Sequence, residues 1–247
     1  MDTGQVSWEK YAAVLFDLDG VITPTAVVHM RAWAEMFNDY LHDRAPEQAP
    51  YTDADYYAYV DGKPRYDGVR DFLASRGLTL PEGTPDDPPE AETVCGLGNR
   101  KNDAFNEVLA RDGVAAYPGS VAFLDHLRGL GTPLGVVSSS ANAPSVLASA
   151  GLVDRFRTIV SGAVATEHRL AGKPAPDTFL FAAEQLGAAA ADAVVLEDAV
   201  SGVRAGAAGG FGLVVGVDRG AGREALAAAG ATLVVSDLAE LVPGGAR

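Results

Sequence analysis

Six short, almost entirely apolar runs constrain the possible fold of this chain more than any other feature of its sequence. Strands that bury one face alternate apolar and polar residues, whereas strands buried on both faces are apolar throughout. Helical patterns separate most of the runs, which predicts a doubly wound α/β domain with a parallel, Rossmann-like sheet. The apolar runs are 12–16, 133–138, 158–162, 193–197, 213–217 and 232–236, and the helical patterns are 120–130, 142–150, 175–187, 199–209 and 221–229.

Residues 26–111 interrupt this alternation, because they show helical patterns and no strand. We interpret them as a small α-helical cap domain inserted after the first strand. The catalytic core would then consist of residues 1–25 and 112–247. The helices expected in the cap are 26–41, 66–77 and 100–113.

A stretch rich in proline, glycine and acidic residues separates the last two cap helices. It covers residues 78–98, LTLPEGTPDDPPEAETVCGLG. Proline and glycine interrupt regular structure, so we expect a surface loop here. For its acidic part, residues 81–92, the sequence supports no interpretation beyond a solvated loop.

The overall charge excludes several classes of partner. The 247 residues carry a net charge of −14, from 19 basic and 33 acidic side chains, and this field repels nucleic acid and anionic membranes.

No apolar run reaches the roughly 18 residues of a membrane span. The N-terminal MDTGQVSWEKY lacks the apolar region of a signal peptide. The single cysteine, Cys95, cannot form an internal disulfide, so we expect a reducing, cytoplasmic compartment. We also expect a monomer.

Two aspartates follow the first apolar run directly, in AAVLFDLDGVITPT at 12–25. In an extended chain Asp17 and Asp19 project to the same side, at the strand end where open α/β sheets bind ligands. Gly20 then permits a tight turn. Two close carboxylates repel each other unless a cation lies between them, and hard oxygen ligands favour Mg²⁺. Taken alone, such acids could also simply end a strand or cap a helix.

A run of hydroxyls ends the second predicted core strand, in VVSSSAN. Ser138, Ser139 and Ser140 precede a helix expected to begin near Asn142. Hydroxyls together with free amides at a helix N-terminus can bind phosphate. Serines also cap helices without any ligand, so this signal is weak by itself.

Two further strand ends carry charged side chains. In GKPAPDTF, Pro174 biases Lys173 towards an extended conformation and Pro176 suits the first turn of a helix, which would hold the lysine at the edge of the sheet. In VVLEDAVSGV, an apolar strand ends in Glu197 and Asp198. A second acidic pair at a strand end suits a Mg²⁺ site shared with the first pair, although one acid could instead cap the helix that follows.

These four stretches, in this order, resemble the motifs of the haloacid dehalogenase-like hydrolase superfamily. The matching residues are FDLDGVIT, SSSAN, GKPAPD and EDAVSG, and the resemblance covers nearly the whole chain. The position of the cap resembles the subgroup with a helical cap after the first strand. Within it, GKPR at 62–65, RKND at 100–103 and YPG at 117–119 resemble the β-phosphoglucomutase subgroup.

The resemblance implies a Mg²⁺-dependent phosphoryl transfer on a hexose phosphate, with β-glucose 1-phosphate converted to glucose 6-phosphate. Asp17 would be the nucleophile that forms an aspartyl phosphate, Asp19 the general acid and base, and Ser138 and Lys173 the groups that hold the phosphoryl group. The implied Mg²⁺ ligands are Asp17, the backbone carbonyl of Asp19, Glu197 and Asp198. The implied substrate-binding residues are His29, Gly62, Arg65, Lys101, Ser140 and Asn142.

Two positions depart from the subgroup's pattern. Pro24 stands where an aspartate is usual at the entry to the cap, and proline cannot cap a helix with its side chain. We expect a stiffer hinge there. Ala141 stands where a lysine is frequent, so one phosphate contact would be missing.

Other functions stay open at this point. A phosphatase of sugar phosphates on the same scaffold is the first alternative, because it differs from a mutase only in letting water attack the aspartyl phosphate. A non-catalytic phosphate-binding regulator is the second, and the presence of Asp17, Asp19, Lys173 and Asp198 argues against it. A dehalogenase is disfavoured because it needs no metal and would leave the second acidic pair unused.

Overall fold

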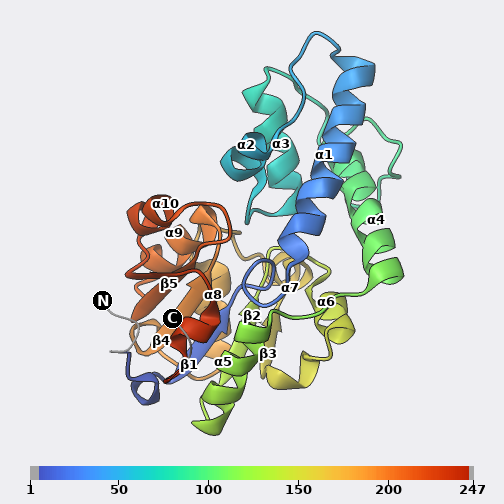
Figure 1. The fold of residues 1–247 in the computed structure, drawn as a ribbon. Helices are drawn as coiled ribbons and strands as arrows, with labels where there is room; N and C mark the ends of the chain where they lie inside the picture. The colour runs from blue at the N-terminus through green and yellow to red at the C-terminus, as the bar shows by residue number, and fades with distance from the viewer. Residues whose placement is uncertain (1–5, 245–247) are drawn as a thin grey trace. The chain divides into compact units, whose positions relative to one another are not determined.

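The computed structural model describes residues 6–244 and divides the chain into two compact units. The larger unit comprises Met1–Pro24 and Val114–Arg247, and the smaller comprises Thr25–Gly113. Residues 1–5 lie outside the described residues. They belong to the N-terminal segment that was predicted not to be a signal peptide. Figure 1 shows the parallel strands of the larger unit and the helices of the smaller one. Each unit is described by itself below.

The larger unit is built on a six-stranded sheet whose strands all run parallel, in the order β3-β2-β1-β4-β5-β6. This topology confirms the predicted doubly wound α/β fold, and each strand falls within a predicted apolar run. The first strand lies in the middle of the sheet, so the loop that follows it lies beside the ends of β2 and β4. The strands are β1 (Ala13–Phe16), β2 (Leu134–Val137), β3 (Thr158–Val160), β4 (Ala193–Glu197), β5 (Leu213–Val217) and β6 (Leu233–Val235).

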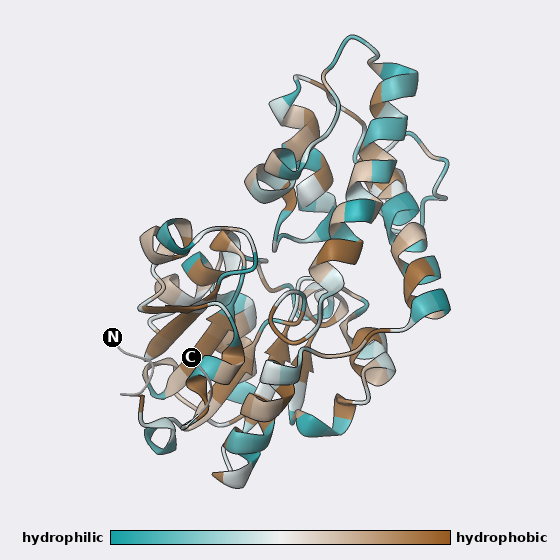
Figure 2. Ribbon diagram, viewed as in Figure 1, coloured by the Kyte–Doolittle hydropathy of each residue, from teal (hydrophilic) through white to brown (hydrophobic). Residues whose placement is uncertain are grey.

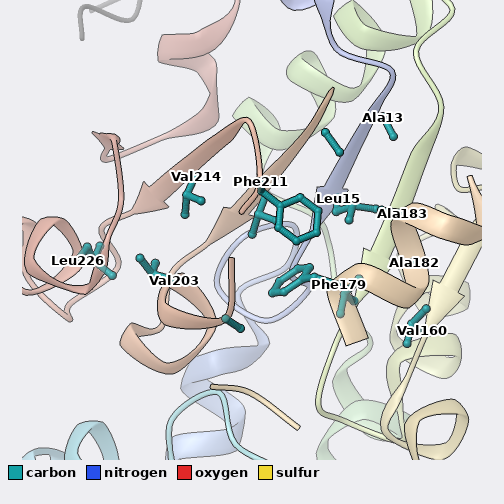
Figure 3. Packing of buried hydrophobic residues seen from close by; sticks show 14 of the residues in the cluster. Ala13, Leu15, Val160, Phe179, Ala182, Ala183, Val203, Phe211, Val214 and Leu226 are labelled. Carbon is teal, nitrogen blue, oxygen red and sulfur yellow. The ribbon is translucent and has the colours of Figure 1, made fainter. Parts of the chain in front are cut away.

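Both faces of the sheet are covered, which explains why its strands are apolar throughout. On one face Leu15 packs in a cluster with Phe179, Phe211 and Val203, which Figure 3 shows together. On the other face the neighbouring Phe16 meets Phe123 edge to face, with ring centroids 6.1 Å apart. Successive side chains of a strand point to opposite faces, so β1 has no solvent-facing side. Phe123, Phe179 and Val203 belong to three of the covering helices, which are α5 (Pro118–Gly129), α8 (Asp177–Gln185) and α9 (Val200–Ala208).

The remaining core helices agree with the sequence pattern except at one place. Helices α6 (Ala143–Ser149) and α10 (Arg223–Ala229) lie within their predicted segments. Helix α7 (Gly162–Glu167) was not predicted, because the run 158–162 was read as strand to its end. The strand stops at Val160, and the Ser161 side chain accepts a hydrogen bond from the Val164 amide. A serine at this position caps a new helix.

The smaller unit is helical, with its own apolar core. Its main helices are α1 (Thr25–Arg44), α3 (Arg65–Ser75) and α4 (Val94–Asp112), with short α2 (Asp53–Asp55) and a π-helical turn, η3 (Tyr56–Val60), between the first two. Phe37, Phe72 and Leu97 are fully buried in one cluster. Trp33 belongs to the same cluster.

The loop predicted at 78–98 is too long by five residues, because α4 begins at Val94. The Thr93 side chain accepts a hydrogen bond from the Gly96 amide and caps the helix. Two glycines in the first turns of α4 concealed the helix in the sequence, since glycine is a poor helix former. The short elements α2 and η3 were also not predicted.

Figure 2 shows by colour that apolar residues concentrate in the strands of the sheet, whereas the helices contain both apolar and polar residues. Among residues 6–244, no helix has the length and apolar character needed to cross a membrane.

Candidate active site

A buried lysine joins two carboxylates at the carboxyl edge of the sheet. Lys173 Nζ lies 2.5 Å from Asp17 Oδ1, just after β1, and 2.6 Å from Glu197 Oε1 at the end of β4. Its third hydrogen bond, of 3.0 Å, goes to the carbonyl of Val137 at the end of β2. All three charged side chains are buried. Three neighbouring strand ends thus converge on one ammonium group, and the structure brings these predicted site residues together.

One lysine that serves two buried carboxylates has clear electrostatic consequences. Burial would lower the pKa of Lys173, but Asp17 and Glu197 outweigh it and hold that pKa above its usual range. Burial raises the pKa of Asp17 well above its usual range, Lys173 opposes this shift, and Glu197 and Asp19 add to it. A further cation at this edge would therefore favour the ionised form of Asp17.

The first aspartate loop and the second acidic pair approach each other closely at Gly20. This residue has a φ of +85°, in the left-handed region that favours glycine. A Cβ atom added there would lie 1.8 Å from Asp198 Oδ2. Only glycine lets the carboxylate of Asp198 lie against the turn that follows Asp17 and Asp19, so Gly20 places the two acidic pairs side by side.

The serines that follow β2 contact Asp19, and their hydroxyls also accept hydrogen bonds from backbone amides of the same segment. Ser138 Oγ lies 3.4 Å from Asp19 Oδ2, which joins the two predicted catalytic groups by a long hydrogen bond. The Ser140 amide donates to Ser138 Oγ, and the Asn142 amide donates to Ser140 Oγ, each over 3.1 Å. These two amides, expected to be free for a phosphate, are occupied by neighbouring serine hydroxyls in this arrangement.

The metal ligands implied by the sequence do not form a metal site by themselves. Within the described part of the chain, no three His, Cys, Asp or Glu side chains are arranged to hold an ion. Glu197 uses one oxygen for Lys173, and its other oxygen accepts from the Ala199 amide over 2.8 Å. The donor types nevertheless fit Mg²⁺, which prefers carboxylate and carbonyl oxygens. Mg²⁺ binding by Asp17, Asp19, Glu197 and Asp198 therefore stays a prediction.

Two side chains that were not predicted from the sequence, Arg219 and Ser120, hold the loop that follows Asp17 and Asp19. Arg219, two residues after β5, donates from Nε to the Gly20 carbonyl over 2.9 Å and lies over the Tyr117 ring, 4.0 Å from its centroid. Ser120 donates to the Val21 carbonyl over 2.7 Å. The position of Arg219, just beyond a strand end in LVVGVDRG, could have indicated that it lies at the same edge of the sheet.

Four predicted substrate-binding residues, His29, Gly62, Arg65 and Lys101, belong to the smaller unit. Lys101 Nζ lies 2.5 Å from His29 Nδ1. An ammonium group can only donate, so Nδ1 of His29 accepts this hydrogen bond. The ring of His29 stacks on Phe105 at 4.0 Å between centroids, and Lys101 and His29 are both buried.

Arg65 is the first residue of α3, and its guanidinium donates to the hydroxyl of the adjacent Tyr66 over 3.1 Å. It follows a turn in which Gly62 has a φ of +69°. Arg65 and Lys101 are thus cations that contact aromatic or imidazole side chains within the smaller unit.

Comparisons with known proteins agree with this fold. The sequence profile of the haloacid dehalogenase-like hydrolases matches residues 11–210. The chain is 52% identical to a β-phosphoglucomutase of Mycobacterium bovis, over 95% of this chain and 92% of that protein. It is 30% identical to hexitol phosphatase A of Escherichia coli, over 79% and 78% of the two chains. A crystal structure of β-phosphoglucomutase from Clostridium difficile has the same fold, with a TM-score of 0.76, 24% identity and coverage of 94% and 93%.

A parallel sheet with charged side chains at the carboxyl ends of its strands is typical of α/β enzymes, which bind their ligands at that edge. Within that class, the chain belongs to the haloacid dehalogenase-like hydrolase family. The resemblance seen in its four sequence motifs is confirmed.

Proposed function

We propose that this enzyme converts β-glucose 1-phosphate into glucose 6-phosphate by two phosphoryl transfers through Asp17. The observation that carries the proposal is the Asp17–Lys173–Glu197 centre, in which a buried carboxylate follows the central strand and shares its lysine with a second acid. The 52% identity to a β-phosphoglucomutase over nearly the full length supports the choice of substrate.

The C6 hydroxyl of β-glucose 1-phosphate would take a phosphoryl group from phosphorylated Asp17, which forms glucose 1,6-bisphosphate. In the transfer that follows, an oxygen of Asp17 forms a bond to the phosphorus at C1 while the bond from that phosphorus to the sugar oxygen breaks, which releases glucose 6-phosphate. Lys173 already contacts Oδ1 of Asp17, so its ammonium lies beside the reacting carboxylate and can neutralise the charge of the phosphoryl oxygens. Ser138 adds a hydroxyl donor at the end of β2. The product of this transfer is an aspartyl phosphate.

Asp19 would transfer protons to and from the reacting oxygens of the sugar. Its position two residues after Asp17, with Ser138 Oγ 3.4 Å from Oδ2, places a second carboxylate beside the nucleophile. In its protonated form it would donate to the departing sugar oxygen, and in its ionised form it would accept the proton of the hydroxyl that attacks next. One residue therefore serves both transfers.

Mg²⁺ would be held by Asp17, the Asp19 carbonyl, Glu197 and Asp198. When bound, it would supply positive charge for the phosphoryl oxygens and lower the raised pKa of Asp17. A cation would be required because one lysine, Lys173, is shared between two buried carboxylates, those of Asp17 and Glu197.

The smaller unit is proposed as the cap domain and the larger as the catalytic core. His29, Gly62, Arg65 and Lys101 would bind the sugar phosphate from the cap, and Ser140 and Asn142 from the core. Of these, Arg65 is proposed for the phosphate distant from Asp17, because a guanidinium binds phosphate with two parallel hydrogen bonds.

A sugar-phosphate phosphatase is the second candidate. The 30% identity to hexitol phosphatase A favours it, as do Pro24 and Ala141 at positions where the mutase pattern differs. In that case water, and not a second sugar hydroxyl, would attack the aspartyl phosphate.

Both candidates can be separated in one reaction. The full-length protein is incubated with Mg²⁺, β-glucose 1-phosphate and a trace of glucose 1,6-bisphosphate, and ³¹P NMR follows glucose 6-phosphate and inorganic phosphate. The proposal expects glucose 6-phosphate to form at least about tenfold faster than phosphate. Inorganic phosphate as the main product would establish the phosphatase, and neither product would contradict both.

The proposed compartment is the reducing cytoplasm, because the one cysteine is buried and free. The monomeric state stays a prediction from the sequence.

A further inference from the structure

The acidic loop, residues 81–92, is fixed on the smaller unit by many contacts. The Asp87 carboxylate accepts from the hydroxyls of Thr84 and Thr93, over 2.8 and 2.6 Å, and these hydrogen bonds lower the pKa of Asp87. The first amides of α4, those of Val94 and Cys95, donate to loop carbonyls over 2.9 and 3.1 Å. The loop thus closes the N-terminus of α4, and its shape is set by its own side chains.

Asn99, in the second turn of α4, connects this loop to the rest of the unit. Its side-chain nitrogen donates to the carbonyls of Pro85 and Asp87, over 3.0 and 2.9 Å. Carbonyls can only accept, so the loop fixes which end of the Asn99 amide faces it. The oxygen of that amide must face the other way.

That oxygen accepts the hydroxyl of Tyr66 over 2.9 Å. Because the Tyr66 proton is committed to Asn99, the phenolic oxygen can only accept from its other neighbour, and it does so from Arg65 over 3.1 Å. The direction of every hydrogen bond from the loop to the guanidinium is therefore determined by two backbone carbonyls of the loop.

Packing restricts the same two side chains. A Cβ atom added at Gly98 would lie 2.8 Å from the Tyr66 ring and 3.2 Å from Cγ of Arg65. Glycine at this position of α4 therefore lets the Tyr66 ring and the Arg65 stem lie against the helix. Arg65 and Tyr66 are half-buried, so neither has the freedom of a surface side chain.

We propose that the acidic loop determines substrate specificity, by holding the Arg65 guanidinium through Asn99 and Tyr66 for the phosphate distant from the reacting one. Asn99 and Tyr66 are positioning residues that act through Arg65. This inference rests on the proposed function, since it assigns Arg65 to a second phosphate. It gives a role to a segment that the sequence identified only as a solvated loop.

The test measures equilibrium binding of glucose 1,6-bisphosphate by calorimetry, in an Asp17→Asn background that cannot be phosphorylated. Arg65→Ala should weaken binding by about 100-fold, as expected for a lost charged contact to phosphate. Tyr66→Phe and Asn99→Ala should each weaken it by about 5-fold, the size of one lost hydrogen bond. Gly98→Ala should do the same by displacing Tyr66. Tyr59→Phe, a matched change in the same unit, should have no effect.

The decisive comparison repeats Tyr66→Phe in the Arg65→Ala background. If Tyr66 acts through Arg65, its effect falls below about 2-fold there, because neighbouring groups that act together are not additive. An unchanged 5-fold effect, or no effect of Tyr66→Phe and Asn99→Ala in the parent, overturns the inference. Melting temperatures within a few degrees of the parent show that the variants are folded.

The inference and the proposed function can fail separately. Mutase activity without measurable bisphosphate binding would leave the function intact and overturn the inference. Binding with the expected coupling, but no glucose 6-phosphate in the NMR assay, would overturn the function and leave the inference standing.

Discussion

The two units of this chain fix their charged groups by different means. In the larger unit, Lys173 is buried between carboxylates that stand at the ends of adjacent strands, so the sheet itself determines their spacing. In the smaller unit, Arg65 is held on helices by a relay of neutral side chains that starts at a loop. Replacing Lys173 in the first arrangement would leave buried carboxylates without a cation, whereas the second depends on neutral hydrogen bonds that a change in the loop would alter. Under the proposed function, the sheet would fix the reacting centre and the loop would fix the contact to the second phosphate.

The largest effect is expected from Lys173→Met. It leaves two buried carboxylates without a cation, which should destabilise the protein by about 3–5 kcal/mol and reduce phosphoryl transfer by at least about a thousandfold. Stability is measured by urea unfolding with a metal chelator present. The control is Lys63→Met, which breaks a more exposed pair with Asp71 and should cost under about 1 kcal/mol. If Lys173→Met and Lys63→Met lost the same free energy of unfolding, the contrast between the buried charged centre of the larger unit and the smaller unit would be contradicted.

Gly20→Ala should reduce turnover by about a hundredfold and raise the Mg²⁺ concentration needed for half-maximal activity. The new Cβ would displace Asp198 and would also strain a residue whose φ is +85°. Gly77→Ala is the matched control, because Gly77 has a φ of +67° in the smaller unit with nothing within 4 Å of the added atom. Both variants should lose about 1 kcal/mol of stability from backbone strain. A normal Mg²⁺ response for Gly20→Ala would contradict the assignment of Asp198.

Replacing one buried phenylalanine in each unit compares the two apolar cores. Phe72→Ala and Phe179→Ala each remove a fully buried ring and should cost about 3–5 kcal/mol. Hydrogen exchange should show lost protection mainly in α1, α3 and α4 for the first variant, and in the sheet for the second. Uniform loss of protection along the chain in Phe72→Ala would show that the units do not unfold separately.

The smallest effect is expected from Pro24→Asp. Pro24 immediately precedes α1, and an aspartate there can cap the helix, which should stabilise it by about 1 kcal/mol. Removing the fixed φ of proline should also change turnover by about two- to fivefold. Steady-state kinetics and thermal unfolding measure the two effects. Turnover identical to that of the natural chain would argue against a role for Pro24 at the hinge.

Much of the core could be predicted because its signals are local. Strands buried on both faces leave continuous apolar runs, and the residue after each run must lie at one edge of a parallel sheet. Asp17 and the Glu197–Asp198 pair were found in this way, whereas Lys173 was indicated by the prolines that follow it at 174 and 176. The sequence could not show that Lys173 contacts both acids, since that depends on side chains brought together from distant segments.

The smaller unit was harder to predict for the same reason. Gly96 and Gly98 concealed the start of α4, although Gly98 is required by its contact with Tyr66. The acidic loop has the composition of a solvated segment, yet hydrogen bonds to Asn99 and to the first turn of α4 order it. Composition and periodicity describe each segment by itself, so they could not predict these contacts between segments.

The most direct test of the account is to trap the covalent intermediate. The protein is mixed with Mg²⁺ and radiolabelled glucose 1,6-bisphosphate, quenched in acid within seconds, and digested for peptide mapping. The account predicts label on the peptide that contains Asp17, and none in Asp17→Asn. Label on any other residue, or turnover with no labelled protein, would contradict it.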